Sequence, residues 1–161
     1  MADKNLFISK DQLRQTTVRL DVKNPVLHLS SLGKRDNFSI KDTLNQRERG
    51  KNSNPILVFT TICWHMPDQY KRKGVYETLD ALAMYKQQTD FNFKWNIIGG
   101  AGIGVGDLRK KVHKLGLDEN VNIIIEAKNK EKRKILFESD LYIQPSWCEG
   151  FGNAVLEAMS H

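Results

Sequence analysis

From Pro55 onward, short apolar runs alternate with segments of helical periodicity. The run Ile56–Thr61 is apolar and β-branched, which is typical of a buried parallel strand. Comparable runs predict further strands at 93–98, 121–125 and 140–144. Helices are expected at 75–83, 107–115 and 130–138 and from about residue 152 onward. Right-handed crossovers leave few other arrangements, so the sequence predicts an α/β fold, a doubly wound parallel sheet with helices on both faces.

The ends of one helix are indicated by single residues: Asp107 is a good N-cap, and Gly116 a good C-terminal stop. Residues 63–74 are expected to form a loop between the first strand and its helix. The first 54 residues lack the alternation. Leu6–Ile8 and Val26–Leu29 suit short strands, whereas 33–54 is rich in charge, Asn and Ser and favours a linker. We therefore expect an N-terminal segment and linker at 1–54 and a Rossmann-like domain at 55–161.

Charge and cysteine content exclude several classes of protein. The net charge of +6 favours anionic ligands in general. The basic run 41–51 is diluted by Asp42 and Glu48 and carries no aromatic residue, so we expect no nucleic-acid partner. Two cysteines without metal-ligand spacing predict neither disulfides nor a metal site. No signal peptide or membrane-length run is present, which favours a cytoplasmic protein with at most peripheral membrane contact.

The candidate site lies where the last expected strand meets the last expected helix. Ligands of such sheets bind at the carboxyl ends of the strands, where the glycine-rich loops fall. Gly150 and Gly152 permit a sharp turn, and the free N–H groups at the start of the helix would form an anion site. Glu149 precedes that helix and Glu157 lies about 7.5 Å along it. Alone, two such glutamates are more often structural, favoured by the helix dipole or facing water, but their place suits a nucleotide diphosphate sugar.

Two other loops belong to the same edge. Lys71–Lys73 precede Gly74 in the first strand–helix loop, where an ammonium group can contact a phosphate, or simply face water. Five glycines lie between Gly99 and Gly106, but Val105 and Asp107 occupy positions that a dinucleotide-binding motif gives to glycine. Two interpretations of these glycines therefore remain: a tight loop, or a loop that faces the phosphate or sugar of a ligand. The basic helix 130–138 suggests a solvated face, and the four histidines have no partner of nucleophilic spacing.

With these motifs, the span from Pro55 to His161 resembles the nucleotide-sugar-binding domain of the family 4 (group 1) retaining glycosyltransferases of GT-B architecture. The resemblance rests on Arg72-Lys73-Gly74, the Ile-x-Gly-x-Gly loop from Ile98, and Pro145-Ser146 ahead of Glu149-Gly150-Phe151-Gly152. Glu157-Ala158-Met159 closes the pattern. The resemblance implies a hexosyltransferase-type enzyme that moves a sugar from a nucleotide diphosphate donor to a glycan, a lipid or a small molecule.

The resemblance also implies roles for individual residues. Lys73 would grip the donor diphosphate, Glu149 would face the transferred sugar as the catalytic residue, and Glu157 would hold the ribose hydroxyls. Backbone amides for sugar and phosphate would come from the loop at Gly100 and from the last turn, that is, from Phe151, Gly152 and Asn153. Fixed amides and a cation would stabilise the leaving diphosphate, so no metal and no cofactor are expected.

Two departures from the family pattern qualify these roles. Thr61 stands where the family usually has an arginine, and the loop to Lys73 is longer than usual, so diphosphate binding is expected to involve Arg72. The family pattern continues past His161, and residues 1–35 resemble at most the tail of an acceptor domain, so we expect a partial domain. The alternatives are a non-catalytic nucleotide-binding or interaction module and, less favoured, an NAD-binding oxidoreductase domain.

Overall fold

A computed structural model describes residues 5–7, 25–27, 56–149, 152–159 and 161. Strands β1 (Asn5–Phe7) and β2 (Pro25–Leu27) pair in parallel. They lie within or beside the two apolar runs that suggested strands near the N-terminus. The predicted linker at 33–54 lies outside the described residues, so the boundary between 54 and 55 stays a prediction.

The main sheet consists of four parallel strands in the order β5-β4-β3-β6. These strands are β3 (Leu57–Ile62), β4 (Phe93–Gly99), β5 (Val121–Ile125) and β6 (Leu141–Tyr142). Because the chain first steps from β3 outward to β5 and then returns to β6 on the other side of β3, the sheet is doubly wound. The fold class predicted from the sequence is confirmed.

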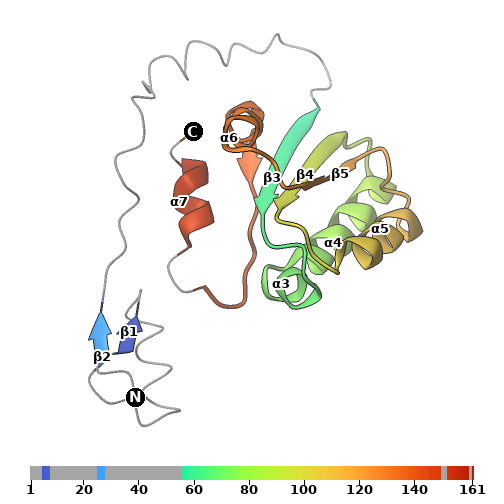
Figure 1. Ribbon diagram of the computed structural model, residues 1–161. Coiled ribbons are helices and arrows are strands. Elements are labelled where there is room, and N and C mark those ends of the chain that lie inside the picture. Colours follow the sequence, from blue (N-terminus) through green and yellow to red (C-terminus); the bar gives the residue numbers. More distant parts are fainter. Residues whose placement is uncertain (1–4, 8–24, 28–55, 150–151, 160) are drawn as a thin grey trace.

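Helices cover both faces of this sheet. They are α3 (Pro67–Arg72), α4 (Val75–Gln88), α5 (Val105–Lys114), α6 (Asn129–Glu138) and α7 (Asn153–Met159). Helices α4 and α5 lie side by side on one face, and α6 lies on the other (Figure 1). A right-handed crossover from β5 back to β6 requires this placement of α6. Among the described residues, no helix has the length and apolar character needed to cross a bilayer.

Several boundaries differ from the sequence prediction, and α4 extends to Gln88, beyond the expected end at 83. The expected loop 63–74 contains α3, which begins with Pro67 and buries Tyr70 completely. Helix α5 begins at Val105, so Asp107 is not the N-cap but lies in the first turn, where its charge favours the helix dipole. The N-cap is Gly104, whose N–H donates to His65 O at 2.9 Å. A tertiary hydrogen bond, not a capping side chain, therefore sets where α5 starts.

Strand β6 is shorter than the predicted 140–144 and pairs with β3 only at Leu141 and Tyr142. The chain remains tied to β3 just beyond it, because the Ile143 N–H donates to Thr60 O at 2.9 Å. The core lies between the sheet and the helices α4 and α5, and its fully buried members include Trp95, Phe93, Ile97, Leu79 and Leu108. This packed core fixes the relative positions of the carboxyl ends of the four strands.

Candidate functional site

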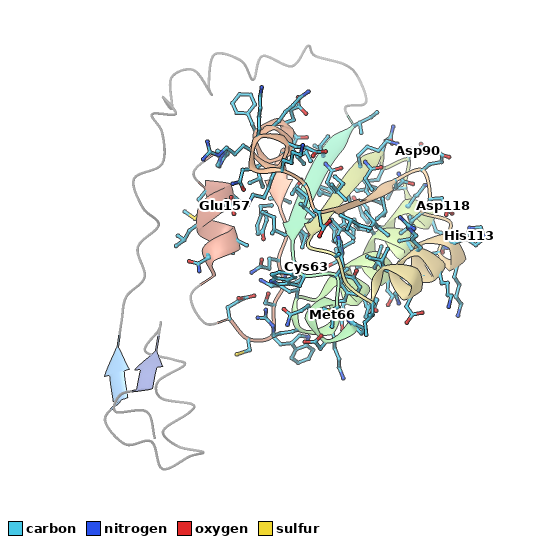
Figure 2. The ribbon with its side chains drawn as sticks, viewed as in Figure 1. Cys63, Met66, Asp90, His113, Asp118 and Glu157 are labelled. Atoms are coloured by element: carbon cyan, nitrogen blue, oxygen red, sulfur yellow. The ribbon has the colours of Figure 1, made fainter. Side chains whose placement is uncertain are left out.

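A cleft of about 580 Å³ runs along the carboxyl edge of the main sheet. Its walls come from the segments that follow β3, β4, β5 and β6 and from the start of α7. Residues from all of these segments line it, among them Trp64, Lys73, Gly100, Glu126, Glu149 and Asn153. Figure 2 shows Cys63, a further lining residue, at the carboxyl end of β3. The location is the one that the sequence predicted for the ligand.

One oxygen of Glu149 collects four donors. Glu149 Oε1 lies 2.8 Å from Lys73 Nζ, 2.8 Å from Ser146 Oγ, 3.0 Å from Gln144 Nε2 and 3.3 Å from Arg72 Nη1. The Lys73 side chain is only 9% exposed, so this ion pair is largely shielded from water. The structure thus brings together Arg72, Lys73 and Glu149, three residues that the sequence assigned to the site.

The backbone around Gly74 makes this contact possible. Gly74 has φ 68°, and a Cβ there would lie 2.6 Å from Pro145 O, so only glycine fits. The loop after β6 is bound to the same turn, because the Trp147 N–H donates to Arg72 O at 3.0 Å and Arg72 Nη1 donates to Cys148 O at 2.8 Å. The end of α3 and the loop after β6 therefore hold one another in place.

The electrostatics of the cluster favour an ionised Glu149. Burial of the carboxyl group raises its pKa, but hydrogen bonds from Lys73 and Ser146 and the charges of Lys73 and Arg72 outweigh burial. The net result is that the pKa of Glu149 is lowered from its usual value of 4.5. At neutral pH the cluster contains two cations that meet at one carboxylate.

The glycines after β4 are explained mainly by packing. A Cβ at Gly99 would lie 1.9 Å from Cys63 O, and a Cβ at Gly102 would lie 2.1 Å from His65 O. The loop is therefore pressed against the segment after β3, as the tight-loop interpretation expects. Gly99 and Gly100 also line the cleft, and the ring of Trp64 covers Gly100, where a Cβ would lie 2.6 Å from it.

His65 is a buried residue that connects the segments around the cleft. Its position in the sequence did not indicate this role. It is completely buried, and its Nε2 lies 3.0 Å from Ile124 O while its Nδ1 lies 2.8 Å from Tyr70 Oη. Because a carbonyl oxygen only accepts, Nε2 carries a proton, and in the neutral ring Nδ1 accepts from the Tyr70 hydroxyl. His65 thus joins the segment after β3 to both α3 and β5.

Thr61, which stands where the family usually has an arginine, does not line the cleft. It is 1% exposed, its Oγ1 donates to Ile143 O at 2.6 Å, and it accepts from Trp95 Nε1 at 3.0 Å. This position belongs to the core, where a guanidinium would lose its hydration. The cations of the cleft accordingly come from Arg72 and Lys73, and from Lys132 across the cleft.

The second glutamate lies behind the cleft wall. Glu157, on α7 (Figure 2), is 12% exposed and its Oε1 lies 2.8 Å from Lys132 Nζ. Lys132 lines the cleft, whereas Glu157 is not among the lining residues. The interpretation of α6 as a solvated basic face was therefore wrong for Lys132, which is 21% exposed. Helical spacing alone does not show that α7 packs beside this lysine.

The remaining predicted residues are placed as follows. Gly152, with φ 71°, and Asn153 line the cleft at the start of α7, and Phe151 lies outside the described residues. Burial raises the pKa of the Cys63 thiol to about 11, despite the nearby charges of Lys73 and Arg72, which disfavours the nucleophilic thiolate form. Within the described part of the chain, no group of three His, Cys, Asp or Glu residues is arranged to hold a metal ion.

Comparisons with known proteins agree with this geometry. The family model described as "Glycosyl transferases group 1" matches residues 61–161. No curated protein matches the sequence.

Solved structures share the fold. The chain is similar to WaaG, a glycosyltransferase involved in lipopolysaccharide biosynthesis, with 15% identity and a TM-score of 0.68 over 96% of this chain and 41% of that one. For sucrose-phosphate synthase from Thermosynechococcus elongatus the identity is 16% and the TM-score 0.70, over 99% of this chain and 39% of that one. For TarM the identity is 21% and the TM-score 0.64, over 96% of this chain and 27% of that one. The chain thus spans less than half the length of each of these proteins.

Proposed function

The chain belongs to the group 1 glycosyl transferases, and from this premise we propose that its cleft binds the nucleotide diphosphate sugar from which a retaining transferase moves a hexosyl group. The observation that carries the proposal is the convergence of Lys73 and Arg72 on Glu149 at the carboxyl edge of β3 and β6. Two cations beside a glutamate suit a ligand whose diphosphate is anionic and whose sugar presents hydroxyl groups.

The cations act most strongly on the leaving group. When the bond between sugar and diphosphate breaks, negative charge develops on the diphosphate oxygens, and fixed cations in a shielded cleft stabilise that charge. The side chain of Lys73 is already held in position by Glu149 and is mostly buried, so little reorganisation is required. We expect no cofactor besides the donor itself.

In this proposal the two glutamates have different roles. Glu149 borders the cleft beside the cations and faces the transferred sugar, so its loss mainly slows transfer. Glu157 holds the ribose hydroxyls, which requires the Lys132 ammonium to yield its place to the ligand, because that ion pair now separates Glu157 from the cleft. Loss of Glu157 therefore weakens donor binding.

Calorimetric titration tests donor binding directly. UDP-, GDP- and ADP-sugars are titrated into the chain, with NAD as the competing ligand, and at least one nucleotide sugar is expected to bind below millimolar concentration. Lys73→Ala is expected to weaken that binding, whereas the matched variant Lys134→Ala, whose side chain is 74% exposed on α6, is not. Binding of NAD alone would replace the proposal with the oxidoreductase alternative.

Variants at the glutamates test the assigned roles. Glu157→Ala is expected to lower donor affinity, and Glu149→Ala to lower the transfer rate with a smaller effect on affinity. Unchanged affinity in Glu157→Ala would refute the ribose assignment.

A non-catalytic nucleotide-binding module is the second candidate. The solved transferases that this chain resembles are longer proteins, of which it spans 27–41%. A turnover assay with this chain separates the two candidates, since transfer of sugar would refute the module.

A further inference from the structure

Glu126 has an unusual backbone for its residue type. It is the one non-glycine residue with positive φ in the described part of the chain, at 57°. It directly follows β5, and its N–H donates to Gly99 O at 2.7 Å, which extends the pairing of β4 and β5. Side chains rarely occupy this region unless the surrounding structure holds them there, and such positions cluster at ligand sites.

The strand order places Glu126 at the end of the cleft opposite Glu149. Glu126 follows β5 and Glu149 follows β6, and β4 and β3 lie between them. Three strand spacings separate the two ends, roughly 14 Å. This inference rests on the proposed function, in which the sugar lies at Glu149 and the diphosphate at Lys73. The base of the same nucleotide then extends toward Glu126.

The Glu126 carboxylate is available to a ligand. Glu126 is exposed and lines the cleft together with Ala127. Among the described residues, no hydrogen bond or ion pair engages its side chain, in contrast to Glu149 and Glu157. An ionised carboxylate only accepts hydrogen bonds, so its ligand must present donors.

The bases differ in the donors that they present. Guanine carries N1–H and the N2 amino group side by side, which matches the two oxygens of one carboxylate. Uracil has one N–H between two carbonyl oxygens that repel a carboxylate, and adenine has its amino group beside an acceptor nitrogen. We propose that Glu126 is a specificity-determining residue that selects a guanosine diphosphate sugar through the N1–H and N2–H groups of guanine.

Titration of the free nucleoside diphosphates into the 161-residue chain tests this proposal. GDP is expected to bind about tenfold or more tightly than UDP or ADP. Glu126→Gln, which replaces one acceptor oxygen by a donor, is expected to remove that preference and leave the dissociation constant of UDP within about twofold. Glu126→Gly, whose residue type is favoured at this φ, is expected to give the same loss without loss of thermal stability.

The control variant is Glu77→Gln, at an exposed glutamate of α4, which is expected to bind all three nucleotides as the unaltered chain does. Equal binding of GDP and UDP, or a GDP preference that survives in Glu126→Gln, overturns the inference and leaves the proposed function standing. Absence of binding by every nucleoside diphosphate overturns both.

Discussion

At Glu149, a single carboxylate oxygen accepts from two cations and two neutral donors. The carboxylate therefore holds the Lys73 and Arg72 cations in place at the cleft. The arrangement keeps two cations close together at little electrostatic cost, because the shared carboxylate screens their repulsion. An anionic ligand beside the cluster can use the other N–H donors of the same ammonium and guanidinium groups.

The lowered pKa of Glu149 predicts an acid-dependent loss of stability. A carboxyl group whose pKa is lower in the folded chain contributes stability above its unfolded value, near 4.5, and that contribution is lost as the pH falls through the folded value. Urea unfolding of the unaltered chain should therefore show a steeper fall in free energy below this pH than unfolding of Glu149→Gln. Parallel curves for the two proteins would contradict the prediction, and Glu77→Gln should follow the unaltered chain.

At the scale of elements, the cleft depends on how closely the segments after β3 and β4 approach one another. His65 accepts from Gly104 N–H at its carbonyl oxygen and donates from its ring to Ile124 O. Gly99 and Gly102 leave no room for a side chain against this segment. The loop glycines thus determine the shape of the cleft floor even where they touch no ligand.

Two alanine substitutions separate packing from chain flexibility. Gly102→Ala would place a Cβ 2.1 Å from His65 O, and the required shift should lower the free energy of unfolding by about 2 kcal/mol. Gly106→Ala, within α5 and with no atom within 4 Å of the new Cβ, should be neutral or stabilising by up to about 1 kcal/mol. Chemical denaturation measures both, and equal losses would contradict the packing explanation.

One hydroxyl group joins three parts of the sheet. Thr61 on β3 accepts from Trp95 Nε1 of β4 and donates to Ile143 O just after β6. Thr61→Val keeps the shape but leaves both partners unpaired in the core, which should cost about 1–3 kcal/mol of unfolding free energy. Thr89→Val, at an exposed threonine, should change the free energy of unfolding by about 0.5 kcal/mol or less. A similar loss at both sites would show that the buried hydrogen bonds of Thr61 are not the cause.

At the scale of the whole molecule, the sheet edge gathers the cations that anionic ligands require. The chain has a formal charge of +6, and Arg72, Lys73 and Lys132 all line the cleft. Arg72 ends α3, Lys73 directly follows it, and Lys132 lies on α6, a separate segment of the chain. If the cleft binds a diphosphate, as we propose, that binding depends on the folded arrangement of the entire sheet.

This coupling predicts thermal stabilisation by ligand. A nucleoside diphosphate at about 100 times its dissociation constant should add about 2.7 kcal/mol, which corresponds to a rise in Tm of roughly 5–10 °C for a domain of this size. Differential scanning fluorimetry measures the shift. The nucleoside without phosphates should give a much smaller one, and Lys73→Ala should reduce the shift by the diphosphate. An equal shift by the nucleoside would show that the phosphates contribute little.

By itself, the sequence determined the order and type of the main elements, the parallel sheet and the edge at which the cleft lies. Hydrophobic periodicity and glycine placement act over a few neighbouring residues, so they can be recognised in the chain before it folds. The candidate roles of Lys73 and Glu149 followed from that placement and from the family resemblance. Their direct contact did not, because it depends on the register of β6 against β3.

Only the tertiary structure decided the remaining features. Thr61 is a core residue and not a site residue, Lys132 faces the cleft while Glu157 stands behind it, and Glu126 adopts a left-handed backbone at the cleft edge. Each of these facts depends on which distant segments pack together. Contacts between residues far apart in the chain are set by the closing of the sheet and the helices over a shared core, and no local pattern of residues records them.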